Sequence, residues 1–225
     1  MRLNRQDVVR AVDSYASLLV LLLANFFVIE LVTDARWGAV ASILLAAAAL
    51  IVAISDPDAG EGLKPWHWVL IAICLALAPA VLLVTSSSLL GVAYLVPVGL
   101  LVSATLPVTL SRIAHHKRVT AETILGATCA YILFGLLFAF VYLALGELRD
   151  APFFAQPGLH EPSEYLYFSF VALTTLGFGD LSPSVGLPQA LTVLEALLGS
   201  VFLVTLVSRL VTLWVRQDEV KAAQS

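Results

Sequence analysis

The hydrophobic pattern divides the chain into six long apolar segments, separated by short polar or charged stretches. A helix needs about 20 apolar residues to cross the hydrocarbon core of a bilayer, and each segment approaches or exceeds that length. The pattern therefore predicts six transmembrane helices, at residues 15–32, 37–55, 66–84, 89–113, 121–145 and 188–215. A seventh apolar stretch, residues 165–174, is too short to span and predicts a re-entrant helix between the last two spans.

The composition also indicates a membrane protein. Hydrophobic residues make up 60% of the 225 residues, charged residues only 12%, and the mean hydropathy is +0.96. A soluble domain carries about 25% charged residues. The net charge is −4 and the basic residues are dispersed, which argues against a nucleic-acid-binding protein. Cys74 and Cys129 both fall inside apolar segments and are interpreted as small buried side chains, not as a disulfide or a metal pair.

The distribution of lysine and arginine predicts the orientation in the membrane. Six spans put both termini on one side, together with ten of the 12 basic residues. Only Arg36 and Arg149 fall on the other side. Cytoplasmic loops are enriched in lysine and arginine, so we expect a multi-pass protein of the cell membrane with both termini in the cytoplasm. Residues 146–187 would then lie outside.

The external segment contains TTLGFGD, residues 174–180, directly after the predicted re-entrant helix. Ser163 is expected to cap that helix, with Glu164 in its first turn. Backbone at membrane depth must be hydrogen-bonded within the protein or line a water-filled path. Gly177 and Gly179 can adopt positive φ, and alternating them with other residues can turn successive carbonyls to one side.

Rungs of oxygen atoms would result from such a backbone. The carbonyls of Thr175, Leu176, Gly177 and Phe178 and the Thr175 hydroxyl would supply them. One chain provides a quarter of each ring, so four chains around an axis would complete cages that replace the hydration shell of an ion.

This stretch resembles the pore of the potassium channel family, whose filter sequence TVGYG corresponds to TLGFG here. The resemblance covers roughly residues 121–215. It implies a homotetramer, selective passive conduction of K⁺ and a water-filled cavity below the filter. It assigns the filter to Thr175, Leu176, Gly177, Phe178 and Gly179, with K⁺ bound by the first four. It assigns support of the filter to Thr174, Asp180 and Tyr167.

The sequence also departs from the family pattern. Ala172 stands where the family commonly has a threonine, and Phe178 lacks a tyrosyl hydroxyl. Tyr167 and Phe168 stand where many members have tryptophan donors, so Asp180 needs another partner. These departures leave every coordinating carbonyl in place and bear on the rigidity of the filter.

Two residues of the last span are further candidates. An acid at membrane depth marks a functional site by default, and Glu195 is expected to support the filter through the pore helix or to act as a proton-sensitive gate. The alternative is a carboxyl satisfied between helices for assembly alone. Gly199 lies where many family members carry a hinge glycine in the inner helix, and close helix packing is the equal alternative.

The expected fold is an all-α integral membrane protein with six transmembrane helices, a re-entrant pore helix and a selectivity filter, tetrameric around a central pore. Residues 1–118 form a four-helix membrane domain, which lacks the arginine series of a voltage sensor. Residues 119–215 form the pore domain and residues 216–225 a short cytoplasmic tail.

The expected function is potassium-selective conduction. The alternatives are a weakly selective cation channel and a non-conducting scaffold or sensor with a vestigial pore. No Ser/His/Asp set, metal-ligand cluster or phosphate loop occurs in the sequence, so we expect no enzyme and no cofactor other than the permeant K⁺.

Overall fold

The computed structural model describes residues 5–32, 35–54 and 121–222 and scattered positions between 69 and 105. Its helices are α1 (Arg5–Leu31), α2 (Ala35–Ile54), α6 (Ala121–Leu148), α7 (Pro162–Leu173) and α8 (Leu187–Ala222). The predicted spans at 66–84 and 89–113 lie largely outside the described residues. The last helix extends beyond the predicted span, so residues 216–222 of the predicted tail continue α8.

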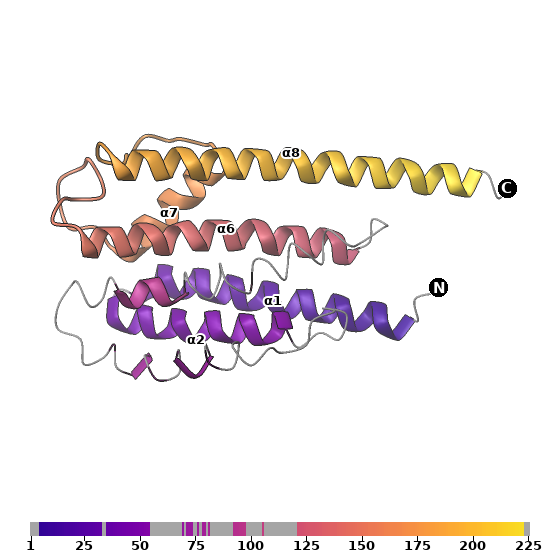
Figure 1. Cartoon of the computed structure of the whole chain (residues 1–225), viewed down its shortest axis with the longest axis horizontal. Coiled ribbons are helices and arrows are strands. Elements are labelled where there is room, and N and C mark those ends of the chain that lie inside the picture. Colours follow the sequence, from indigo (N-terminus) through magenta and orange to yellow (C-terminus); the bar gives the residue numbers. More distant parts are fainter. Residues whose placement is uncertain are drawn as a thin grey trace.

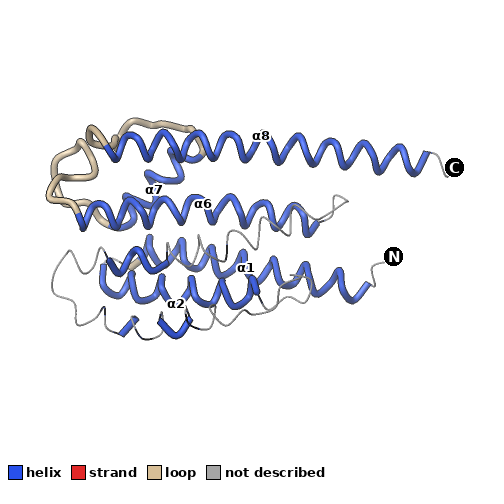
Figure 2. The backbone as a smooth tube through the Cα atoms, in the orientation of Figure 1, coloured by secondary structure: helices blue, strands red, loops and turns tan. Residues whose placement is uncertain are grey.

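The helices form a layered bundle in which α6 lies in the middle (Figure 1). The short helix α7 lies between α6 and α8 at one end, and it contacts both. Helix α1 packs on the other side of α6 and also contacts α7, and α2 packs on α1. Helix α1 begins and α8 ends at the opposite end of the bundle from the loops that flank α7 (Figure 2).

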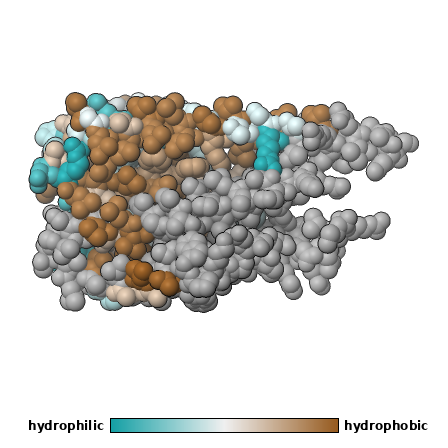
Figure 3. Space-filling model, viewed as in Figure 1, coloured by the Kyte–Doolittle hydropathy of each residue, from teal (hydrophilic) through white to brown (hydrophobic). Residues whose placement is uncertain are grey.

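Two of the described helices are long and apolar enough to cross a membrane. They are Ile124–Leu148 of α6, with 25 residues, and Leu187–Arg209 of α8, with 23. The apolar parts of α1 and α2, Tyr15–Leu31 and Arg36–Val52, are shorter. Apolar surface covers much of the visible face of α6 and α8, and hydrophilic groups gather at the end that carries the loops (Figure 3).

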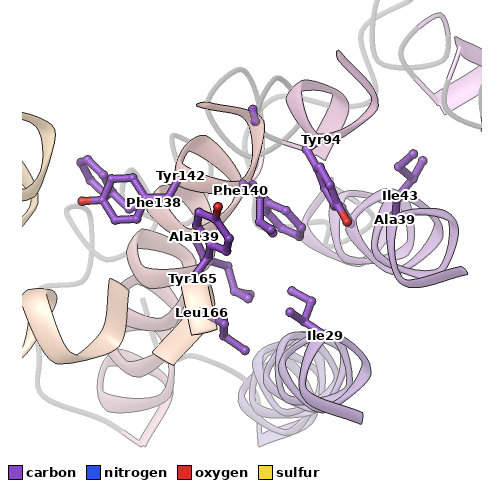
Figure 4. Close-up of a cluster of buried hydrophobic side chains, with 14 of the residues drawn as sticks. Ile29, Ala39, Ile43, Tyr94, Phe138, Ala139, Phe140, Tyr142, Tyr165 and Leu166 are labelled. Carbon is purple, nitrogen blue, oxygen red and sulfur yellow. The ribbon is translucent and has the colours of Figure 1, made fainter. Parts of the chain in front are cut away.

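The hydrophobic core joins α1, α2, α6 and α7. Tyr142 and Phe140 of α6 are fully buried in it, together with Leu166 of α7 and Ile43 of α2 (Figure 4). Small buried side chains let α2 approach α1 closely. They include Ala39, Ala46 and Ala49.

The start of α7 differs from the prediction. The N-cap is Glu161 and the helix begins at Pro162, so the expected cap Ser163 lies inside the first turn. Proline suits this position because its missing N–H would have no intrahelical partner there. The Glu164 side chain accepts a hydrogen bond from the backbone N–H of Glu161 at 2.8 Å.

Candidate functional site

The segment after α7 has a backbone whose φ alternates in sign. Thr175 has φ +57°, Gly177 +57° and Gly179 +81°, whereas Leu176 and Phe178 between them lie outside the positive region. No atom lies within 4 Å of where a β-carbon would stand on either glycine. The backbone conformation, and not crowding within the chain, therefore favours glycine at these positions.

Positive φ at Thr175 is the feature that the sequence did not reveal. A β-branched residue in this region is an outlier, because its β-carbon crowds the backbone, and the strain costs about 1–3 kcal/mol. Such strain persists only where the surrounding structure imposes it. Thr175 therefore marks the segment as a site that is held in shape by its neighbours.

Hydrogen bonds at the C-terminal end of α7 fix the backbone around Thr175. The last four carbonyls of a helix lack intrahelical partners, and here all four accept a bond. The Phe170 carbonyl accepts from the N–H of Thr174, and the Val171 carbonyl accepts from the N–H of Leu176, both at 3.0 Å. The Ala172 carbonyl accepts from the N–H of Thr175 at 3.0 Å. The Leu173 carbonyl accepts from the Tyr131 hydroxyl at 3.2 Å. The Thr174 hydroxyl also donates to the Phe170 carbonyl at 2.6 Å. These bonds set the direction in which residues 175–179, called the filter segment after the expectation from the sequence, leave the helix.

Tyr167 and Asp180 meet at the C-terminal end of the segment. The Tyr167 hydroxyl donates to Asp180 Oδ2 at 2.7 Å. The rings of Tyr167 and Phe178 lie nearly parallel, with 7° between their planes and 6.5 Å between their centres. Tyr167 thus supplies the donor for Asp180 at one of the positions where tryptophan is common in the potassium channel family. The hydrogen bond from Tyr167 favours the charged carboxylate and lowers the pKa of Asp180 below its ordinary 3.8.

We expect Tyr167→Phe to raise the pKa of Asp180 towards that ordinary value, because the variant lacks the donor. A group with a lowered pKa stabilises the fold above its ordinary pKa and loses that contribution as the pH falls. The wild-type Asp180 carboxylate should therefore stay ionised, and keep its bond from Tyr167, to a lower pH than that at which the variant's Asp180 is protonated. Carbon-13 NMR titration of the labelled Asp180 carboxyl measures the shift, with Tyr165→Phe on the same helix as control. Identical titration curves for wild type and Tyr167→Phe would contradict the assignment.

Glu195 joins three helices behind the filter segment. Its side chain is fully buried, with 0% of its surface exposed. The hydroxyl of Tyr142 in α6 donates to Oε2 at 2.6 Å, and that of Ser169 in α7 lies 2.5 Å from Oε1. Ser169 Oγ also lies 2.8 Å from the carbonyl oxygen of Gly135 in α6. One carboxyl thus bridges α8 to both α6 and α7.

Sequence reasoning missed Tyr142 and Ser169 as the partners of Glu195. For Tyr142, the distance from the end of its helix could have indicated the pairing. Tyr142 lies six residues before the end of α6 and Glu195 eight residues after the start of α8. At 1.5 Å per residue these are roughly 9 and 12 Å from the same end of two antiparallel helices, so the side chains share one level.

Gly199 lies against the C-terminal end of α7. A β-carbon there would stand 2.6 Å from the Leu173 carbonyl oxygen and 2.8 Å from Leu173 Cδ1. Helix α8 runs unbroken through this position. The contact supports the close-packing alternative for Gly199, because no larger residue permits this approach of α8 to α7.

The loop before α7 is tied to the loop after the filter segment. Phe153 and Phe154 are buried, and Phe154 forms an isolated antiparallel bridge with Pro183. The Ala155 N–H donates to the Ser182 carbonyl at 2.8 Å. These contacts hold the polypeptide beyond Asp180 against the loop between α6 and α7, at one end of the bundle (Figure 2).

One comparison with known proteins matches the part of the chain that contains these features. Residues 150–216 match a family model described as ion channel. Searches of curated proteins and of solved structures found no match. The matched residues contain the loop before α7, α7 itself, the filter segment and most of α8. The match and the two long apolar helices support a membrane protein of an ion channel family.

Proposed function

We propose that the protein is a potassium-selective channel that conducts K⁺ passively across the cell membrane through a homotetrameric pore. The alternation of φ from Thr175 to Gly179 carries this proposal, because a short segment of alternating hand can present successive carbonyls to one axis. It lies inside the part of the chain that matches ion channels.

The proposed mechanism is exchange of water for protein oxygen. The carbonyls of Thr175, Leu176, Gly177 and Phe178 and the Thr175 hydroxyl, from four chains, replace the hydration shell of K⁺. Repulsion between ions in neighbouring sites drives them onward. Gly179 ends the filter segment. The segment is supported by Thr174, Tyr167, Asp180 and Glu195.

Exposed apolar surface on α8 supports association of several copies. In an apolar 18-residue stretch of Leu187–Arg209, only 11% of the residues are buried within one chain, against 56% in such a stretch of Ile124–Leu148. Leu176 and Phe178 of the filter segment are 60% and 65% exposed. Four chains around an axis would bring the filter segments together and place α8 along the central cavity, facing its neighbours.

The N-terminal region is proposed as a membrane domain that does not sense voltage. Residues 1–118 would supply four helices, and both termini would lie in the cytoplasm. Residues 119–215 would form the pore unit.

Reversal potentials of the purified protein in lipid bilayers test the selectivity. With potassium on one side and an equal concentration of sodium on the other, we expect a reversal potential far from zero, of the sign that opposes potassium efflux, because the potassium-to-sodium permeability ratio is high. Near-equal permeabilities would favour the weakly selective cation channel instead. No flux of either ion from well-folded, reconstituted protein would favour the non-conducting scaffold or sensor.

A further inference from the structure

We propose that α1 is part of the conducting unit and that Phe26 is a positioning residue for the pore helix. The inference rests on the proposed function for its effect on conduction. The contact that carries it stands independently, because α1 packs directly on α7 as well as on α6.

Phe170 is the residue of α7 through which α1 acts. Its ring lies against the backbone of α6 at Gly135, where a β-carbon would stand 2.5 Å from the ring atom Cζ. The ring of Phe26 meets the Phe170 ring edge-on, with 5.4 Å between the centres and 84° between the planes. The Phe170 side chain is therefore held between α6 on one side and α1 on the other.

The same residue anchors the start of the filter segment. The Phe170 carbonyl accepts the N–H of Thr174 at 3.0 Å and its hydroxyl at 2.6 Å. The next residue along the chain, Thr175, has the strained positive φ. A shift of Phe170 would thus move the turn from which the filter leaves α7.

Neighbouring side chains of α1 hold Phe26 in place. Leu22 and Ile29 are buried, four residues before and three residues after Phe26, so the three side chains lie on one side of the helix. Ile29 belongs to the same buried cluster as Leu166 of α7 (Figure 4). Helix α1 therefore presents an apolar face to the back of the pore helix, and the N-terminal region can act on the filter without a charged voltage sensor.

The chain offers a matched control for Phe26. Phe27 is the next residue, carries the same side chain and is 55% exposed, and its ring contacts Phe26 rather than the pore helix. Full-length Phe26→Ala and Phe27→Ala, reconstituted in the same lipid, differ in whether the contact with Phe170 is lost. Phe26→Leu keeps most of the apolar volume, so it removes the aromatic contact in a protein that is expected to fold.

Hydrogen exchange of the amides at residues 174–176 is the first readout. We expect faster exchange there in Phe26→Ala, a smaller increase in Phe26→Leu and none in Phe27→Ala. The second readout is the potassium-to-sodium permeability ratio, which should fall about two- to tenfold in Phe26→Ala, the factor that corresponds to loss of one aromatic pair. In a Phe170→Leu background, Phe26→Ala should add nothing further.

Equal effects of Phe26→Ala and Phe27→Ala, or full additivity with Phe170→Leu, would overturn the inference. A wild type without flux whose amide exchange still responds to Phe26→Ala would refute the proposed function and leave the positioning role standing. A conducting wild type whose exchange and selectivity ignore Phe26→Ala would refute the positioning role alone.

Discussion

Gly177→Ala is expected to abolish selective potassium conduction while the chain still folds. Gly177 has φ +57°, a region that disfavours any residue with a β-carbon by about 1–2 kcal/mol. No atom lies within 4 Å of the added carbon, so the change strains the filter backbone without a clash inside the chain. In a tetramer the strain occurs four times around one axis. Potassium flux from liposomes and the reversal potential with sodium measure the outcome.

Gly158→Ala is the control for this prediction. Gly158 lies in the loop before α7 and has φ +130°, and likewise no atom lies within 4 Å of where its β-carbon would stand. The substitution imposes backbone strain outside the filter segment, so flux and selectivity should survive it. Conduction by Gly177→Ala at the wild-type rate and selectivity would count heavily against the assignment of the filter.

Glu195→Ala is expected to loosen the pore helix from α8 and α6. The change removes the acceptor of the Tyr142 hydroxyl and the partner of Ser169 in a fully buried position. An unpaired buried hydroxyl costs about 1–3 kcal/mol, and this applies to Tyr142, whereas Ser169 keeps the Gly135 carbonyl at 2.8 Å as a partner. We expect a lower melting temperature of the reconstituted protein and a reduced potassium-to-sodium permeability ratio.

Glu195→Gln separates the hydrogen bonds from the bulk of the side chain. Glutamine keeps the length of glutamate, can accept from Tyr142 and can bond Ser169 through its amide. It should retain most of the stability that Glu195→Ala loses. Asp150→Ala, at an exposed position, should change neither property. A melting temperature and selectivity of Glu195→Ala equal to those of the wild type would show that this carboxyl does not support the filter.

The elements of the pore region follow closely from the sequence. The length of the apolar segments predicted α6 and α8, and the short apolar stretch at 165–174 predicted α7 to within a few residues. Gly177 and Gly179 were predicted as positions of positive φ because glycine alone adopts it without strain, and both have it. These features depend on local chemistry, which the sequence displays directly.

Features that depend on tertiary packing did not follow from the sequence. Nothing in a threonine signals the positive φ of Thr175, which the capped end of α7 imposes. The cap of α7 was predicted at Ser163 and lies at Glu161, where Pro162 favours the helix start. The meeting of Glu195 with Tyr142 spans 53 positions of the chain, and the pairing of Phe26 with Phe170 spans more. Such contacts depend on how the helices pack, which no single segment encodes.

A structure of the purified protein, determined in potassium and in native-like lipid, tests the proposed pore most directly. We expect four chains around one axis, with a column of potassium density between the carbonyl oxygens of residues 175–178. A monomer or dimer, or a tetramer without axial density at these residues, would contradict the proposal.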